Sequence, residues 1–321
     1  MSVTYRGRFA PSPSGPLHFG SLVAAVGSFL HAKIHAGKWL VRIEDIDQTR
    51  VVKGAADDIL RTLDALALHW DESVRYQTDQ LALYDSVLAC LSAQHKLYRC
   101  NCTRKMIKAM GGIYDKRCRT AQHNDINNTA LRFINDGSNT SFFDENLGWI
   151  TPEKRFVEDD VVVKRRDGLH AYQLVVVVDD IDQDITHVVR GADLLDLTPV
   201  QQRLFTTISD SVHTQPPTTI THAVHTTINQ RMAQQRRIPK FLHLPLAVTA
   251  PHQKLSKQNH AVPINLANKA AEMHRALQFL GIPIPAELAQ DKIATQLEWA
   301  IVHHQTWHFN TQTEILVDTD T

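Results

Sequence analysis

The apolar positions near the start of the chain alternate between strand and helix spacing. Residues 6–10 and 37–47 predict strands, and residues 17–35 between them carry apolar side chains at helical intervals. Two amphipathic helices are predicted next, over residues 51–68 and 79–94. This alternation predicts an α/β fold in which helices cover the faces of a parallel sheet.

The composition then turns polar, which predicts a small inserted α+β domain. After it, the run Leu174–Val178 (LVVVV) predicts a strand buried on both faces. Residues 198–209 predict a helix with a proline in its first turn, and weakly helical segments follow to the end. The predicted domains are a first half of the sheet domain over 1–98, the insertion over 99–158, the second half over 159–236 and a mostly helical C-terminal region over 237–321.

The charge balance limits the classes of partner. Lysine plus arginine and aspartate plus glutamate number 34 each, so the formal net charge is zero. A general nucleic-acid binder is usually basic, so this balance disfavours one without excluding a local basic patch. The run Leu174–Val178 is the longest apolar stretch and is far too short to span a bilayer. A cytoplasmic protein with no membrane partner is expected.

The segment RFAPSPSGPLHFGS, residues 8–21, lies between the first predicted strand and the first predicted helix. A helix start presents unpaired backbone N–H groups and a partial positive charge, so this loop is a candidate anion site. Ligands of open parallel sheets bind at this edge of the sheet. Alone, the loop is weak support for function, because most such loops are only turns.

A second segment, KLSKQ at residues 254–258, predicts a cationic loop. Alone it would be read as a solvated surface loop. In this order and on an α/β chain, PLHFGS and KLSKQ resemble the two signature sequences of the class I aminoacyl-tRNA synthetases.

Three longer segments narrow the resemblance to the catalytic core of glutamyl-tRNA synthetases. They are RFAPSPSGPLHFGS, RIEDIDQTR and VVVDDIDQDITHVVRGADLLDLTPVQ, and the likeness runs from about Arg6 through His260. It implies a Rossmann-type catalytic domain, split by an acceptor-binding insertion, that activates an amino acid with ATP and Mg²⁺. Activation is mostly a matter of positioning and charge stabilisation.

The resemblance implies how ATP is bound. His18 would hydrogen-bond the phosphates, and Gly20 would let the nucleotide approach the backbone closely. Lys257, supported by Lys254, would close over the pyrophosphate from a moving loop. The implied catalytic residues are His18, Lys254 and Lys257, and the implied ATP-binding residues are His18, Gly20, Ser21 and Lys257.

A glutamate site needs cations for the carboxylates and an anion for the ammonium group. By resemblance, Arg8 and Arg190 hold the substrate carboxylates and Glu44 takes the ammonium. Tyr172 would add a hydrogen bond from the start of the valine-rich strand. The implied glutamate-binding residues are Arg8, Phe9, Ala10, Pro11, Ser12, Glu44, Tyr172 and Arg190. The hypothesis is a preference for glutamate over glutamine.

The cysteines predict a metal site. Cys90 lies on the apolar side of a predicted helix and is expected in the core, whereas Cys100, Cys102 and Cys118 crowd together in the predicted insertion. Three thiolates are one ligand short of a tetrahedral zinc site. From chemistry alone a histidine would complete it, and His123 is near in sequence.

The stretch CNCTRKMI…GGIYDKRC resembles a tRNA-synthetase-like family in which a tyrosine oxygen completes the site. That resemblance implies Tyr114 as the fourth ligand, with His123 the alternative. With all four positions filled by the protein, one structural zinc ion per chain is expected.

The chain ends soon after the lysine loop, at Thr321, which leaves too little for the anticodon-binding region of a full glutamyl-tRNA synthetase. It therefore resembles their truncated paralogues, the glutamyl-Q tRNA(Asp) synthetases. That family activates glutamate without tRNA and transfers it to the cyclopentene diol of queuosine in the anticodon of tRNA(Asp). The alternatives are a minimal synthetase that charges tRNA(Glu) and a non-catalytic RNA-binding paralogue.

The implied partners are L-glutamate, ATP and queuosine-bearing tRNA(Asp), and a monomer is expected. Loop bases can be splayed and read one at a time, unlike those in a duplex. Lys164, Arg165 and Arg166 are candidates for phosphate contacts, although such a charge run is usually a solvated face.

Overall fold

The computed structural model describes residues 4–121, 123, 125, 128–214, 237–255 and 261–317. Of the predicted site residues, Lys257 lies outside the described residues. The other predicted site residues are described.

Two groups of parallel strands meet near the middle of the molecule. The first has the order β1 (Arg6–Phe9), β2 (Lys38–Ile43) and β3 (Arg75–Tyr76). The second has β9 (His187–Gly191), β10 (Lys240–Leu244) and β6 (Phe142–Asp144), with β7 (Gly148–Ile150) antiparallel at its edge. Thr186 N–H donates to Arg6 O at 2.9 Å and Arg6 N–H donates to Thr186 Oγ1 at 2.8 Å, which joins the groups. The predicted α/β class with a parallel sheet is confirmed.

Helix α1 (Phe19–Ile34) is the main helix packed on this sheet. Leu22, Val26 and Leu30 repeat every four residues and are fully buried. They share one core with apolar residues of β2, among them Trp39. The strand β1, the loop after it and α1 thus form the strand–loop–helix unit expected from the sequence, and α1 begins at the sheet edge where the candidate anion site was predicted.

The valine-rich run forms a helix, so the prediction of a strand there is wrong. Residues Tyr172–Asp182 form α6, which packs against α3 (Leu81–Ala93) and α7 (Thr198–Thr214). The side chains of Leu174–Val178 are all buried, on every side of the helix. A short apolar run buried all round carries no periodicity, so strand and helix cannot be told apart from it. Tyr172 therefore lies at the start of a helix.

Residues 97–164 contain a smaller sheet. Its strands are β4 (Leu97–Cys100), β5 (Ala130–Phe133) and β8 (Val162–Lys164), all antiparallel, accompanied by α4 (Arg104–Ala109) and α5 (Lys154–Val157). The hairpin of β6 and β7 also falls in this part of the sequence but pairs with β10. The boundaries 99–158 of the inserted domain stay a prediction.

The C-terminal part was expected to be mostly helical, and this expectation missed several strands. It contains β10 in the central sheet, and β11 (Leu246–Ala250), β12 (Gln253–Lys254) and β13 (Glu314–Leu316) in a separate sheet. Helices α9 (Lys269–Phe279) and α10 (Ile293–Val302) were expected in kind and pack on α1.

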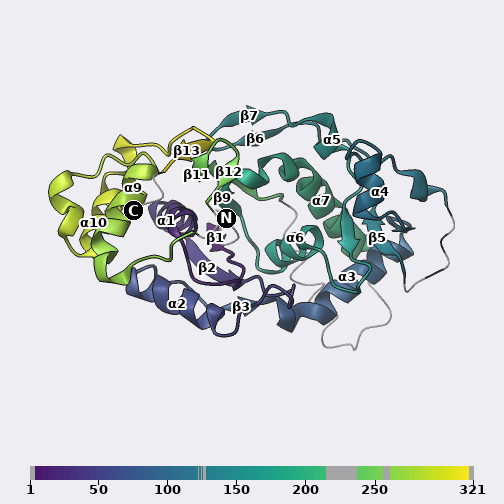
Figure 1. Cartoon of the computed structure of the whole chain (residues 1–321), viewed down its shortest axis with the longest axis horizontal. Helices are drawn as coiled ribbons and strands as arrows, with labels where there is room; N and C mark the ends of the chain where they lie inside the picture. Colours follow the sequence, from purple (N-terminus) through teal and green to yellow (C-terminus); the bar gives the residue numbers. More distant parts are fainter. Residues whose placement is uncertain are drawn as a thin grey trace.

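The predicted N-terminal helices are also present, and short 3-10 helices complete the described chain. The bounds are α2 (Ala55–Ala65), η1 (Gln77–Gln80), η2 (Arg117–Arg119), η4 (Ala192–Leu197), η6 (Leu266–Asn268), η7 (Ala286–Gln290) and η8 (His304–Thr306). Figure 1 shows α9 and α10 at one end of the long axis, β1, β2 and β9 in the middle, and α4 and β5 at the other end. None of the described helices is long and apolar enough to cross a membrane.

Candidate active site

His18 is the N-cap residue of α1. Its backbone is extended, and its Nδ1 accepts a hydrogen bond from the backbone N–H of Ser21 at 3.3 Å. This cap satisfies one of the N–H groups that a helix start leaves unpaired. Because Nδ1 is the acceptor, the neutral imidazole carries its proton on Nε2. His18 is thus fixed as a donor at the positive end of a helix.

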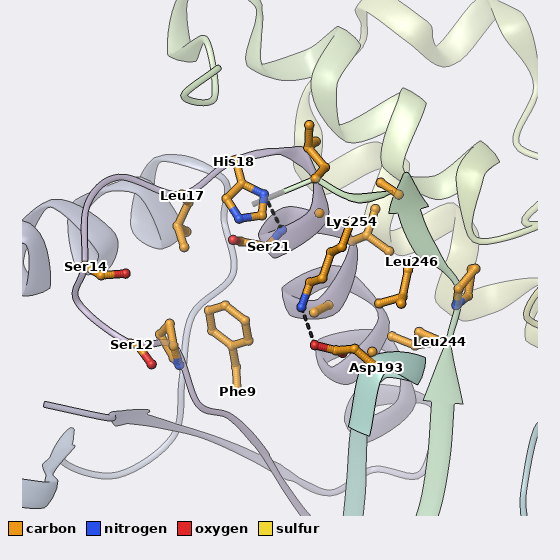
Figure 2. A pocket seen from close by; sticks show the side chains of 18 of the residues that line it. Phe9, Ser12, Ser14, Leu17, His18, Ser21, Asp193, Leu244, Leu246 and Lys254 are labelled. Atoms are coloured by element: carbon orange, nitrogen blue, oxygen red, sulfur yellow. Dashed lines mark hydrogen bonds and ion pairs between the residues drawn. The ribbon is translucent and has the colours of Figure 1, made fainter. Parts of the chain in front are cut away.

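A cavity of about 330 Å³ opens at this helix start. Figure 2 shows Ser12 and Ser14 from the loop, His18 and Ser21 from α1, and Lys254 paired with Asp193 around this cavity. Of the residues predicted to be catalytic or to bind ATP, the structure brings His18, Gly20, Ser21 and Lys254 to this cavity. Three residues predicted to bind glutamate also line it: Phe9, Pro11 and Ser12.

Gly20 is required by its immediate neighbours. A Cβ atom there would lie 3.2 Å from Cε1 of His18, closer than ordinary van der Waals contact. A larger residue would therefore push the capping imidazole aside. That Gly20 lets the nucleotide approach the backbone closely stays a prediction.

Lys254 lies on β12 and forms an ion pair with Asp193 of η4. Both side chains are partly exposed and both line the cavity. The sequence analysis found Lys254 but not its partner, because Asp193 is distant in sequence. In this arrangement the ammonium group of Lys254 is directed at Asp193, and both residues line the cavity at the start of α1.

A second cavity, of about 770 Å³, adjoins the first. Glu44 and Tyr172 line it, and Ser12, Ser14 and Arg50 line both cavities. The predicted ATP and amino-acid halves of the site therefore share a wall. Ala10 follows β1 in the loop, while Arg8 and Arg190 are buried and are not among the described residues that line either cavity.

Arg8 is held in place by Asp180 of α6. Its Nε donates to Oδ1 at 3.0 Å and its Nη2 to Oδ2 at 3.4 Å. Arg42 donates to the same carboxylate from Nη2 at 2.5 Å. Burial raises the pKa of Asp180, but the positive charges of Arg8 and Arg42 outweigh it and hold the pKa below its usual value. The carboxylate thus stays ionised and leaves Nη1 of Arg8 for another ligand.

Glu44 and Tyr172 have perturbed pKa values. Burial raises the pKa of Glu44 to about 7, although Arg42 and Arg8 oppose the shift. Burial and the charge of Glu44 raise the pKa of Tyr172 to about 12, so its hydroxyl is protonated and can donate. The positive charges of Arg8 and Arg190 oppose this rise in the pKa of Tyr172. Perturbed groups around one cavity are typical of a functional site.

Arg190 lies at the end of β9 and is 6% exposed. Its Nη1 donates to Gln201 Oε1 at 2.7 Å, and its Nη2 donates to Thr198 Oγ1 at 2.9 Å. Its Nε donates to Nε2 of His243 at 3.1 Å. Its Nη2 also donates to the carbonyl of Leu194 at 3.2 Å, and none of these partners is a carboxylate, which sets Arg190 apart from Arg8.

The acidic end of α6 organises further arginines that the sequence analysis did not select. Arg75 donates from Nη1 to Asp179 at 3.3 Å, and Asp179 also accepts from Tyr84 Oη at 3.0 Å and from Gln77. Asp182 forms an ion pair with Arg75. The sequence signal was present in the DDID run, but its role depends on the helix and on distant strands.

The three predicted cysteine ligands come together. The sulfur atoms of Cys100, Cys102 and Cys118 all lie within 4.8 Å of one another, and those of Cys102 and Cys118 are 3.6 Å apart. Thiolates on one tetrahedral zinc ion are roughly 3.8 Å apart, from Zn–S bonds of about 2.3 Å. The cluster therefore has the donor set and spacing of a zinc site. Cys90 lies apart and is buried, as predicted.

Tyr114 lies against this cluster. The backbone N–H of Cys118 donates to Tyr114 Oη at 3.3 Å, and the ring is buried in one small core with Cys100 and Cys118. Among the described histidine, cysteine and acidic residues, the cluster holds only the three cysteines, so His123 is not in it. Arg132 stacks on the Tyr114 ring at 3.9 Å.

The basic run at the end of β8 is already partnered. Lys164 pairs with Asp85 at 3.0 Å and Arg165 with Asp47 at 2.7 Å. Arg166 donates to the carbonyl of Asn101 at 2.6 Å. Arg165 and Arg166 also line the larger cavity, toward the cysteine cluster.

Comparisons with known proteins agree with this geometry. The family model for the catalytic domain of class I tRNA synthetases (E and Q) matches residues 4–236. A glutamyl-Q tRNA(Asp) synthetase from Colwellia psychrerythraea is 45% identical over 95% of this chain and 92% of its own. One from Photobacterium profundum is 44% identical over 92% and 87%. This chain belongs to the glutamyl-Q tRNA(Asp) synthetase family.

A ligase of the class I tRNA synthetase type is thereby established, as predicted. The crystal structure of a glutamate tRNA ligase from Elizabethkingia meningosepticum has a TM-score of 0.68 to this chain, at 20% identity. This chain covers 68% of that protein, and 99% of this chain is matched. At that identity the likeness shows the fold, which is the class I catalytic fold of this family.

Proposed function

We propose that this protein activates L-glutamate with ATP in the absence of tRNA and transfers it to the queuosine of tRNA(Asp). The names of the relatives supply the nucleic-acid substrate, since they are called glutamyl-Q tRNA(Asp) synthetases. One observation supports the glutamate-activation half of the proposal: Ser12 lines both the cavity that contains His18 and the larger cavity that contains Glu44.

The amino-acid half of the site complements glutamate in charge. Arg8 and Arg190 provide two buried guanidinium groups for the carboxylates of the substrate. Tyr172, whose pKa responds to the negative charge of Glu44 and to the positive charges of both arginines, provides a hydroxyl donor. Glu44 provides the carboxylate for the substrate ammonium group. A neutral carboxamide would satisfy the guanidinium charges less well, so glutamate is preferred over glutamine.

The first reaction joins a glutamate carboxylate oxygen to the α-phosphorus of ATP and breaks the bond to pyrophosphate. The residues Phe9–Ser12 orient the carboxylate, and the N-terminus of α1 with His18, Gly20 and Ser21 receives the phosphates. Lys254, with Lys257 three positions later in the sequence, stabilises the charge that develops on pyrophosphate. Mg²⁺ accompanies ATP as its counter-ion.

The second reaction moves the glutamyl group from the adenylate to a hydroxyl of the queuosine diol, with release of AMP. The larger cavity extends from Glu44 toward Cys102 and Arg166, which leaves room for a nucleoside beside the amino acid. In this proposal Lys164, Arg165 and Arg166 exchange their present partners for RNA phosphates. Because the net charge of the chain is zero, we expect its affinity for RNA to be modest and to fall as the salt concentration rises.

The cysteine cluster in this proposal holds one structural zinc ion. Cys100, Cys102, Cys118 and Tyr114 are its ligands, which fits the sulfur spacing and the placement of Tyr114 Oη beside Cys118. The ion fixes the loop that lines the outer part of the larger cavity and takes no part in the reaction. The inserted domain of residues 99–158, a monomeric state and a cytoplasmic location belong to the same proposal.

The test separates the two reactions. The protein is incubated with labelled glutamate and ATP, and glutamate-dependent pyrophosphate exchange is measured without RNA. Queuosine-bearing tRNA(Asp), tRNA(Asp) without queuosine and tRNA(Glu) are then added in parallel. Label on queuosine-bearing tRNA(Asp) alone supports the proposal. Label on tRNA(Glu) would instead identify a minimal glutamyl-tRNA synthetase, and absence of exchange would identify a non-catalytic paralogue.

A further inference from the structure

Arg190 is a buried cation whose hydrogen-bond partners in the described chain are all neutral groups. They are the imidazole of His243, Gln201 Oε1, Thr198 Oγ1 and the carbonyl of Leu194. Burying a guanidinium without a counter-charge is costly. An arginine placed in this way must either be compensated at a distance or receive an anionic ligand.

Burial lowers the pKa of Arg190, and the negative charges of Asp180 and Asp193 act on Arg190 to oppose this shift. A hydrogen-bonded link to a further carboxylate, that of Asp144, runs through His243. On the paired strands β9 and β10, Arg190 and His243 are direct neighbours in register. The guanidinium can only donate, so Nε2 of His243 must accept. The proton of the imidazole is therefore on Nδ1, which donates to Oδ2 of Asp144 at 2.7 Å. Arg190 and Asp144 together fix His243 as the tautomer with its proton on Nδ1.

Asp144 anchors the other end. It is 0% exposed and lies at the end of β6, next to β10 in the sheet. Its Oδ1 accepts from the backbone N–H groups of Asn146 and Leu147, both at 3.0 Å. The carboxylate is thus fixed by the turn between β6 and β7, and it fixes the imidazole in turn. Burial lowers the pKa of His243 to about 4, in keeping with a neutral ring.

We propose that Asp144 and His243 are positioning residues for Arg190. They hold the guanidinium in one orientation and offset its charge across one imidazole, so that the cation keeps its capacity to bind a substrate carboxylate. This inference deepens the proposed function and rests on it.

Arg8 provides the contrast within the same site. Arg8 is paired directly with Asp180, whose carboxylate also accepts a hydrogen bond from Arg42. Much of the positive charge of Arg8 is therefore already neutralised. Arg190 has no carboxylate partner among the described residues and is one imidazole removed from Asp144. Arg190 is therefore the guanidinium that distinguishes a carboxylate from a carboxamide, and the Asp144–His243 pair determines specificity through it.

Two substitutions of His243 test separately the roles of its two ring nitrogens. Asn places its amide nitrogen near the position of Nδ1, so His243→Asn keeps a donor for Asp144 and loses the acceptor for Arg190. Gln reaches the position of Nε2, so His243→Gln restores an acceptor for Arg190. His31→Gln is the matched control, because His31 is also a buried histidine with a hydrogen bond, from Tyr5 Oη at 2.7 Å.

The readout is glutamate-dependent pyrophosphate exchange by the full chain without tRNA, with folding checked by circular dichroism. His243→Asn is expected to raise the KM for glutamate about tenfold or more, with the KM for ATP unchanged. The ratio of kcat/KM for glutamate over glutamine should fall by a similar factor. His243→Gln should recover part of both losses, because the acceptor for Arg190 returns while the donor to Asp144 does not, and His31→Gln should show neither loss.

The outcomes distinguish the inference from the function on which it rests. A folded His243→Asn variant whose KM for glutamate stays within about twofold of the parent overturns the inference alone. Equal losses of kcat in all three variants would indicate a merely structural role and would also overturn it. Absence of glutamate-dependent exchange by the unaltered protein overturns the proposed function and this inference together.

Discussion

Arg8 on β1 and Asp180 on α6 meet in a two-point ion pair, with nitrogen–oxygen distances of 3.0 and 3.4 Å. The two residues are 172 positions apart in the sequence. The pair ties the first strand of the sheet to a helix from the second half of the chain. It also orients Arg8, which we propose binds the substrate, so we expect stability and activity to depend on the same carboxylate.

Replacing Asp180 therefore tests both roles. In Asp180→Asn, Arg8 and Arg42 lose their shared counter-charge, and breaking a buried pair costs about 3–5 kcal/mol. We expect a lower melting temperature and a fall of about a hundredfold in kcat/KM for glutamate. Asp182→Asn is the control, since Asp182 pairs with Arg75 on the same helix. Its melting temperature should fall, but its KM for glutamate should not change; equal KM effects would contradict the assignment of Asp180.

The pKa of Glu44, raised by burial from 4.5 to about 7, predicts a pH dependence of activity. Only the carboxylate form binds the substrate ammonium group. The kcat/KM for glutamate should therefore rise as pH increases through about 7, because this parameter reports groups of the free enzyme. Pyrophosphate exchange measured from pH 5.5 to 8.5 checks this. A profile that is flat across neutral pH would remove Glu44 from this role.

The same shift has a consequence for stability. Between pH 4.5 and about 7 the folded state binds more protons at Glu44 than the unfolded state does, so this residue lowers the stability as pH rises through that window. Glu44→Gln removes the effect. We expect the variant to be inactive in exchange yet more stable at pH 8 by about 1–3 kcal/mol, and closer to the parent at pH 5. Denaturant unfolding at the two pH values measures the difference; a destabilised variant at pH 8 would contradict it.

Local pattern was sufficient for part of this site. The loop after β1, the helix that follows it and the cysteine cluster are set by residues close together in the sequence, and each was predicted from it. The capping bond of His18 was not predicted. Leu174–Val178 shows the limit, because a segment buried on every side has no apolar period to reveal a helix.

The remaining site residues depend on contacts between distant elements. Asp180 acquires its role from Arg8, and His243 from the register of β9 against β10. Asp144 reaches His243 from a third strand, β6, which pairs with β10. A local signal such as the DDID run that contains Asp180 does not reveal the role of such residues, since a buried polar group is functional only through the partner that the fold places beside it.

The cysteine cluster predicts one zinc ion per chain, and Cys102→Ser should abolish it. The serine hydroxyl is a much poorer zinc ligand than a thiolate, so metal content measured on the purified protein should fall close to zero. Cys90→Ser is the control, because that buried cysteine lies outside the cluster and should leave the zinc content unchanged. Tyr114→Phe should weaken retention against a chelator at least tenfold. Unaltered zinc in Cys102→Ser would refute the site.

Lys254 supplies the last prediction, because its ammonium group is held at the His18 cavity by Asp193. Lys254→Ala removes a positive charge from the place where pyrophosphate develops negative charge. We expect kcat for exchange to fall by about ten- to a hundredfold, with the KM for glutamate unchanged, because the amino acid binds in the adjoining cavity. Lys269→Ala is the control, since its ammonium group donates to the carbonyl of Ala65 on the surface. A Lys254→Ala variant that changes only the KM for glutamate would place this lysine at the amino acid and not at the phosphates.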